Sequence, residues 1–230
     1  MVFGGIQKST LIDYPGKVSC VLFFSGCNFH CPFCHNPELA KGTALEQWPE
    51  QAAFDFLEKR KGFLEGVVIS GGEPCLHPDV IRVCRTIWQM GYSIKLDTNG
   101  SCPNVLEKLI SGGLVDYVAM DIKTVPELYP QYIQKDCNTD AITSSIGLIK
   151  ASGLSHEFRT TCIRPLIDKH IVRSICGMIQ GADLYVLQRF RLSRVLNPEF
   201  FKAHDYRITE NDLLEYRAIA EKWVTSCRIR

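Results

Sequence analysis

The sequence SGCNFHCPFCHNP, residues 25–37, follows directly on the apolar run Val18–Phe24 and carries three cysteines, Cys27, Cys31 and Cys34. The Gly, Pro and Asn residues around them are typical of a loop, and a loop this short can wrap a single metal centre. Three thiolates leave one iron of a 4Fe-4S cubane open to an outside ligand. The spacing therefore predicts a cluster that takes part in chemistry rather than one that only carries electrons.

Three simpler interpretations compete with the cluster. Zinc could take the three cysteines and His35, although a His next to the last Cys fits one tetrahedral shell poorly. Cys31 and Cys34 could form a redox-active dithiol, but Cys27 would then have no role and no helix start is evident there. Inert buried cysteines are a weak explanation in a stretch with loop composition. We therefore favour the iron–sulfur cluster.

Short apolar, β-branched runs alternate with stretches of helical spacing along the whole chain. Strands are expected at Val18–Phe24, Gly66–Ser70, Tyr92–Leu96, Val115–Ile122, Glu157–Ile163 and Leu184–Phe190. Helices are expected at Pro49–Lys61, Pro78–Met90, Asn104–Ser111, Thr139–Ala151, Lys169–Gln180 and Glu210–Thr225. The alternation indicates an α/β fold with parallel strands, either a partial barrel of six units or a flat doubly wound sheet. Both folds bind ligands at the carboxyl ends of the strands.

The composition is that of an ordinary globular protein. The chain has 230 residues, of which 46% are hydrophobic and 22% charged, so one domain without a linker is expected. A formal net charge of +1 supplies no field that would attract nucleic acid or an anionic membrane. We find no apolar run of the roughly 18 residues that a membrane span needs and no secretory signal, and therefore expect a cytoplasmic protein.

Polar residues follow the predicted strands in turn. GGEP at 71–74 lets the backbone come close to a ligand and offers a glutamate to an ammonium group, although alone it is a tight turn. DTNG at 97–100 is explained equally well by turn chemistry. Asp121 and Lys123 share one side of the next strand, where a simple ion pair is the alternative interpretation. Arg159 on the following strand could be a charge at the rim. Because all of them lie near carboxyl ends of strands, we expect one binding site.

The CxxxCxxC spacing of residues 27–34, together with GGEP and DTNG, resembles the radical S-adenosylmethionine (SAM) superfamily. DYPGK at 13–17 and CHNP at 34–37 are further similar to the activating enzymes of glycyl-radical enzymes, and most of all to the longer activating proteins of anaerobic ribonucleoside-triphosphate reductase. The likeness runs from about residue 5 to 191. It implies a partial (β/α)6 barrel of the radical SAM type in a single domain over 1–230, with an N-terminal lead-in over 1–16 and a C-terminal helix over about 209–226.

The resemblance implies a role for each motif residue. Cys27, Cys31 and Cys34 would ligate the cluster, and one cluster is expected because no second cysteine group lies between Cys34 and Gly71. Gly72 and Glu73 would meet the amino group of SAM. The ribose and carboxylate of SAM would be surrounded by Asn36, Asp97, Thr98, Asp121, Lys123 and Arg159. Related activases have a histidine near the end of the sixth strand, where this chain has Gln188.

The implied reaction is radical SAM oxidoreductase chemistry, in which the cofactors carry the difficult step. One electron from the reduced cluster cleaves SAM, and the resulting 5′-deoxyadenosyl radical takes hydrogen from a glycine α-carbon of the partner. The implied partner is a glycyl-radical enzyme, with anaerobic ribonucleotide reductase favoured over pyruvate formate-lyase or another such enzyme. The implied electron donor is a flavodoxin or ferredoxin-like protein. A non-catalytic iron–sulfur or zinc protein is the alternative from another class, but it leaves GGEP and Lys123 without a role.

The chain has eleven cysteines, an odd number, which favours metal binding or catalysis for some and burial for the rest. Cys84 and Cys176 lie within expected helices and are expected to be core residues. The remaining cysteines outside the loop have no assigned role: Cys20, Cys75, Cys102, Cys137, Cys162 and Cys227.

Overall fold

The computed structural model describes residues 1–43 and 47–230. Its chain divides into two units, each with its own strands and helices. Unit 1 comprises Met1–Asn28, Glu38–Thr98 and Asn104–Val118, and unit 2 comprises Phe29–Pro37, Asn99–Pro103 and Ala119–Arg230. The expected single domain over 1–230 stays a prediction.

Unit 1 contains the first three expected strands, which pair in parallel. They are β3 (Ser19–Phe24), β5 (Gly66–Gly71) and β6 (Ser93–Thr98). Phe24 lies beside Gly71, and Ile69 lies beside Leu96, so the three strands end at the same level. Both faces of β3 and β5 are buried, as expected of strands that are apolar almost throughout. The residues that follow them are thereby gathered at one edge, as the sequence predicts.

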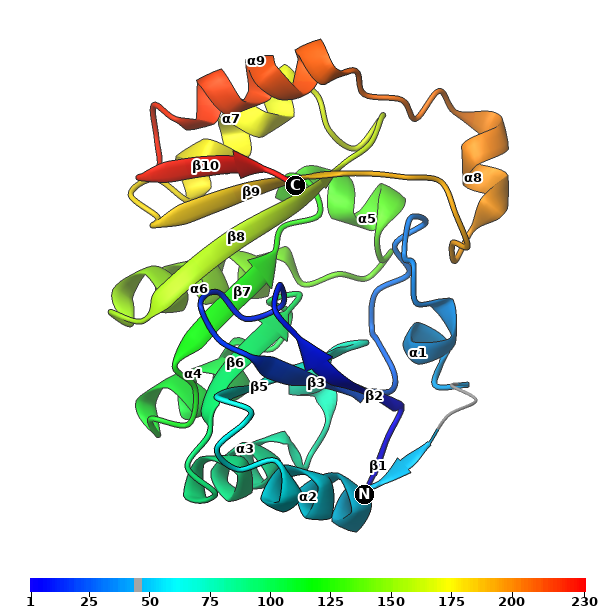
Figure 1. The fold of residues 1–230 in the computed structure, drawn as a ribbon. Coiled ribbons are helices and arrows are strands. Elements are labelled where there is room, and N and C mark those ends of the chain that lie inside the picture. Colours follow the sequence, from blue (N-terminus) through cyan, green and yellow to red (C-terminus); the bar gives the residue numbers. More distant parts are fainter. Residues whose placement is uncertain (44–46) are drawn as a thin grey trace. The chain divides into compact units, whose positions relative to one another are not determined.

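The helices α2 (Glu50–Lys59), α3 (Val80–Gln89) and α4 (Pro103–Ser111) lie along these strands and bury apolar residues (Figure 1). The short helix α1 (Pro37–Lys41) has one buried residue, Pro37. In α3 the buried residues recur at i, i+3, i+4 and i+7 from Val80 to Ile87, which is the inward face of a helix. Cys84 belongs to this stripe and is completely buried, which confirms it as a core residue. A short 3₁₀ helix, η1 (Pro74–Leu76), follows β5.

Unit 2 contains three parallel strands, β8 (Ser155–Cys162), β9 (Leu184–Arg189) and β10 (Ser226–Ile229). Cys162 lies beside Arg189, so β8 and β9 end together. The fourth expected strand, β7 (Tyr117–Asp121), begins in unit 1 and ends in unit 2. Figure 1 shows α7 and α9 lying against one face of β9 and β10. Cys176 of α7 is completely buried, as expected.

The helices of unit 2 begin with strong caps. The side chain of Asp168 accepts two backbone N–H bonds at the start of α7 (Lys169–Met178), and Thr209 and Asp212 form a capping box on α9 (Glu210–Ala220). The longest helix is α6 (Thr139–Ala151), which has the bounds expected from the sequence. The shorter ones are η2 (Pro126–Leu128), α5 (Tyr129–Tyr132) and α8 (Pro198–Ala203).

All six expected strands are confirmed within two residues or so, but other elements were not expected. An edge strand, β2 (Gly5–Thr10), runs antiparallel to β3 within the expected lead-in. Its middle residues are polar and exposed, so it lacks the apolar run by which the other strands are found. A small antiparallel pair joins β1 (Val2–Phe3) to β4 (Trp48–Pro49).

The C-terminal segment differs from the expectation of a helix over about 209–226. The helix ends at Ala220, and the chain turns back so that β10 extends the sheet of unit 2 beside β9. Val224, Thr225 and Ile229 are β-branched, and such residues favour strands over helices. In the part of the chain that the structure describes, no helix is both long and apolar enough to cross a membrane.

Candidate functional site

The cysteine loop leaves β3 and is fixed first to α1. The backbone N–H groups of Gly26 and Cys27 donate to the carbonyl oxygens of Leu39 and Ala40, at 2.7 and 3.0 Å. Two consecutive hydrogen bonds of this kind hold the backbone at Cys27 in one orientation. The division into units falls just after this point, so Cys27 belongs to unit 1, whereas Cys31 and Cys34 belong to unit 2.

A pair of glycines packs the end of β5 against the chain that leads to Cys27. Gly72 donates to the carbonyl of Phe24 and Glu73 donates to the carbonyl of Gly26, both at 2.8 Å. A Cβ on Gly72 would overlap the carbonyl oxygen of Gly26, and Gly71 has a φ of 123° that L-residues rarely adopt. The glycines of GGEP are therefore needed for a close backbone approach as well as for a turn.

Glu73 and Thr98 meet at this edge of unit 1. The carboxylate of Glu73 accepts from the Thr98 hydroxyl at 2.8 Å and from the backbone N–H of Cys75 at 3.0 Å. Its side chain is only 1% exposed, so these bonds replace the water that a buried carboxylate loses. Two residues expected to face the same ligand are thus in direct contact.

Asp97 is held by two further residues of the same unit. It accepts from the Ser70 hydroxyl at 3.0 Å and forms an ion pair with Lys95. Lys95 is 2% exposed, an unusual position for a lysine unless its charge is paired. We did not expect a role for Lys95 from the sequence, yet it lies two residues before Asp97 on a strand, where side chains point to the same face. This two-residue spacing is the feature of the sequence from which the Lys95–Asp97 pair could be predicted.

Within unit 2, the segment after β9 contacts the second half of the cysteine loop. Leu196 donates its backbone N–H to the carbonyl of Cys34 at 3.0 Å, and Asn197 donates to the carbonyl of Pro32 at 3.2 Å. His35 stacks on Phe190 with a 5.3 Å centroid separation, and its Nδ1 lies 3.1 Å from the hydroxyl oxygen of Ser193. These contacts order the loop around Cys31 and Cys34, and no local sequence pattern predicts them.

Asp121, Lys123 and Arg159 form one ion-pair cluster in unit 2, as their positions in the sequence suggest. Asp121 accepts from the Arg159 Nε at 2.7 Å and from the Lys123 Nζ at 3.0 Å. Burial alone would raise the pKa of Asp121, but the positive charges of Arg159 and Lys123 outweigh it and lower that pKa. Burial would likewise lower the pKa of Lys123, whereas the negative charges of Asp121 and Cys31 raise it.

A second carboxylate stands beside Arg159. Glu157 lies 3.8 Å from Arg159 and 3.1 Å from Arg230, and it is 1% exposed. Lys123, Arg159 and Arg230 thus lie next to Asp121 and Glu157 in one group of paired charges.

The remaining predicted residue, Asn36, is exposed on the loop beyond Cys34. Among the described residues, no three His, Cys, Asp or Glu side chains converge so that they could hold one metal ion. Ligands of a cubane need not converge on one point, because each thiolate binds a different iron.

Five cysteines outside the loop are poor ligands. Burial raises the pKa of Cys20, Cys84 and Cys162 to about 12, and that of Cys176 to about 11. Burial raises the pKa of Cys227 to about 12 as well. Metal ligation requires the thiolate, which these environments disfavour at neutral pH.

A model of the radical SAM superfamily matches residues 21–175, which is more than half of the chain. The chain belongs to the radical SAM superfamily. A Methanocaldococcus jannaschii protein named as a glycyl-radical enzyme activating enzyme is 36% identical over 98% of this chain and 94% of its own length. The pyruvate formate-lyase-activating enzyme of Listeria monocytogenes is 35% identical, over 52% of each chain. This radical SAM protein is therefore an enzyme of the glycyl-radical enzyme activating family.

Solved radical SAM structures share the fold. A radical SAM methyltransferase from Sphaerobacter thermophilus superposes with a TM-score of 0.70 at 14% identity, covering 96% of this chain and 68% of its own. Methylornithine synthase superposes with a TM-score of 0.66 at 15% identity, covering 91% of this chain and 63% of its own. These neighbours confirm the expected fold class, an α/β fold with parallel strands of the radical SAM partial-barrel type.

The glycine contact yields a prediction about stability. We expect Gly72→Ala to lower the free energy of unfolding by about 1–3 kcal/mol, because its Cβ must displace the Gly26 backbone. For a chain of this size the melting temperature should fall by about 2–4 °C for each kcal/mol, as measured by circular dichroism. Gly147→Ala in α6 is the matched control, since nothing lies within 4 Å of its Cβ position and alanine favours a helix. Equal melting temperatures for the two variants would contradict the packing argument.

Proposed function

We propose that this chain is a radical SAM activase that reductively cleaves SAM and generates a glycyl radical on anaerobic ribonucleoside-triphosphate reductase. The observation that carries the proposal is the 36% identity, over 98% of this chain, to a relative named as an activating enzyme of glycyl-radical enzymes. The sequence motifs DYPGK and CHNP favour the reductase as the partner. Activation of pyruvate formate-lyase is the second candidate, because its activating enzyme is 35% identical over 52% of this chain.

The proposed cofactors are one 4Fe-4S cluster and SAM. Cys27, Cys31 and Cys34 would hold the cluster, since they are soft donors on one loop, whereas burial favours the protonated thiol at five cysteines elsewhere. When bound, the cluster supplies the single electron for cleavage of the carbon–sulfur bond of SAM. The close approach of Gly72 to Gly26 leaves that backbone free of side chains, which suits a bulky group next to Cys27. The residues present therefore fit the proposed cofactors.

Charge supports the assignment of the SAM contacts. The methionine part of SAM carries an ammonium and a carboxylate. In unit 1, the Glu73 carboxylate together with Gly72 would receive the ammonium, and Asp97 and Thr98 would face the ribose. In unit 2, Asn36, Asp121, Lys123 and Arg159 would receive the carboxylate or the ribose, with Lys123 and Arg159 supplying positive charge. Asp121 would keep Lys123 and Arg159 oriented and charged.

Two further assignments belong to this proposal. A flavodoxin or ferredoxin-like protein would supply the electron, and the protein would act in the cytoplasm. A protein substrate is favoured over a small molecule because the sequence offers no motif beyond those assigned to SAM.

The three loop cysteines should be required for the cluster. After anaerobic reconstitution, we expect about four irons and four sulfides per chain, with visible absorption that dithionite bleaches. Alanine at Cys27, Cys31 or Cys34 should abolish both the cluster and SAM cleavage. Cys84→Ala is the control: it should lower stability by about 0.5–3 kcal/mol and retain the iron. Stoichiometric zinc in the isolated protein, with no cluster formed on reconstitution, would refute the assignment.

The SAM contacts can be tested apart from the cluster. Lys123→Met and Glu73→Gln should each weaken SAM binding about tenfold or more, because each removes a hydrogen bond to a charged group. Their iron content should stay near that of the wild type. Titration calorimetry with reconstituted protein gives the affinity, and Lys150→Met on the exposed side of α6 is the control. Unchanged affinity in both variants would remove the two residues from the site.

The partner is tested by the radical itself. Reduced protein, SAM and the anaerobic reductase should yield 5′-deoxyadenosine together with a doublet glycyl-radical signal in electron paramagnetic resonance. Replacing the acceptor glycine of the reductase with alanine should remove the signal, because the radical resides on that α-carbon. SAM cleavage without a radical on the reductase would overturn this assignment. A signal on pyruvate formate-lyase in its place would establish the second candidate.

A further inference from the structure

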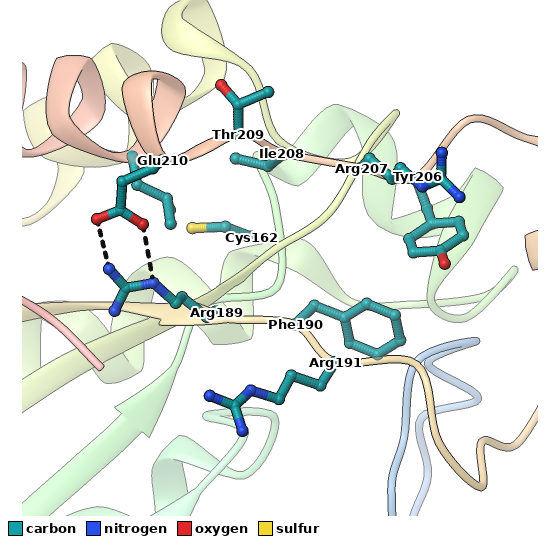
Figure 2. A pocket seen from close by; sticks show the side chains of 10 residues that line it. Cys162, Arg189, Phe190, Arg191, Tyr206, Arg207, Ile208, Thr209 and Glu210 are labelled. Carbon is teal, nitrogen blue, oxygen red and sulfur yellow. Dashed lines mark hydrogen bonds and ion pairs between the residues drawn. The ribbon is translucent and has the colours of Figure 1, made fainter.

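Unit 2 contains a cavity of about 420 Å³ that none of the proposed SAM contacts lines. It lies beyond the carboxyl ends of β8 and β9 and is closed on the far side by the segment that leads into α9 (Figure 2). Arg189, Arg191 and Arg207 are among its lining residues. A pocket of this volume is large enough for several side chains of a bound molecule.

Two of the three arginines are available to a ligand. Arg189 is neutralised by Glu210, with hydrogen bonds of 2.5 and 3.2 Å between guanidinium and carboxylate. Arg191 and Arg207 are exposed, and no ion pair involves either of them within residues 1–43 and 47–230. The nearby Asp205 accepts a hydrogen bond from the backbone of Arg207 rather than from its side chain. The pocket therefore has an excess of two positive charges, which suits an anionic occupant with planar carboxylates.

The aromatic side chains at the pocket do not offer a surface for a nucleobase. His35 and Phe201 both stack on the ring of Phe190, with centroids 5.3 and 5.0 Å away. Tyr206 meets Phe190 and Phe201 edge to face, at 5.9 and 5.1 Å. Because these rings are engaged with one another, a nucleotide would gain its phosphate contacts without stacking. An acidic peptide needs only the arginines and an apolar wall.

The N-terminus of α9 does not offer a second binding site for an anion. The Thr209 side chain accepts from the backbone N–H of Asp212, and Asp212 accepts in return from the backbone N–H of Thr209. The capping box thus uses N–H groups that would otherwise attract an anion. The arginine side chains are the groups that remain for recognition.

The position of the pocket fits a long substrate. Cys162 lines it and lies three residues beyond Arg159 on β8, which at about 3.3 Å per residue places the two Cα atoms roughly 10 Å apart. Three or four residues of extended chain span that distance. We propose that this pocket binds an acidic segment of the partner protein through Arg191 and Arg207, an inference that rests on the proposed function of the chain as an activase.

The pocket is tested first with a peptide. The probe is a fluorescein-labelled peptide of four consecutive glutamates flanked by tyrosines, with glutamines in place of the glutamates in the control peptide. We expect fluorescence anisotropy to detect binding of the acidic peptide, and the Kd to rise at least tenfold in the double variant Arg191→Ala/Arg207→Ala. Arg173→Ala, an exposed arginine of α7 outside the pocket, is the matched control and should leave the Kd unchanged.

The inference is wrong if the acidic peptide does not bind the wild type, if Arg173→Ala weakens binding equally, or if the glutamine peptide binds equally well. Displacement of the peptide by ATP with a higher affinity than its own would assign the pocket to nucleotides and would overturn it as well.

The second test uses the glycyl-radical protein that accepts the radical. The KM for that protein should rise at least tenfold in the double variant, while kcat and SAM cleavage without the partner stay at wild-type values. A normal KM would overturn the pocket assignment and leave the activase function standing. Absence of radical transfer by the wild type to either candidate partner would instead refute the proposed function, with the peptide measurement still deciding what the pocket binds.

Discussion

Two stretches of backbone meet without side chains between them where β5 ends beside β3. Gly71 and Gly72 make this possible, and the hydrogen bonds from residues 72 and 73 to residues 24 and 26 fix it. The contact sets the exit direction of the chain at Cys27 and, on the other strand, the start of the turn that buries Glu73. Space for backbone, rather than any single attractive contact, is thus the constraint on which the arrangement of unit 1 depends.

Charge is organised around this backbone in small, internally paired groups. The buried or half-buried charges of Lys95, Asp121 and Arg159 are each paired with a charge of opposite sign, as burial demands. Lys95 fixes Asp97, while Arg159 and Lys123 share Asp121. Such groups hold their geometry before a ligand arrives, so little reorganisation is needed when one binds.

The sequence predicts the strands well, because apolar runs between polar turns are a local property. It also identifies the cysteine loop and GGEP, whose residue types have few other uses at that spacing. It does not predict β2, whose exposed polar residues hide an edge strand, or β10, which depends on a neighbour more than 35 residues away. The contacts of Phe190 and Ser193 with His35 join residues about 155 positions apart, and no periodicity reports such pairs. The two-residue spacing of Lys95 and Asp97 indicates that their side chains share one face of the strand. Taken by itself, however, Lys95 is only a single charge in a buried strand.

The hydrogen bonds between the segment after β9 and the cysteine loop join an early part of the chain to a late one. Cys34 precedes Leu196, its hydrogen-bond partner, by 162 residues. At a synthesis rate of about 5–20 residues per second, the ribosome adds the later segment roughly 8–30 seconds after the loop. Until then the loop lacks the hydrogen bonds that hold the backbone at Pro32 and Cys34 in the folded chain. The final conformation of the loop therefore forms only after the later segment has been made.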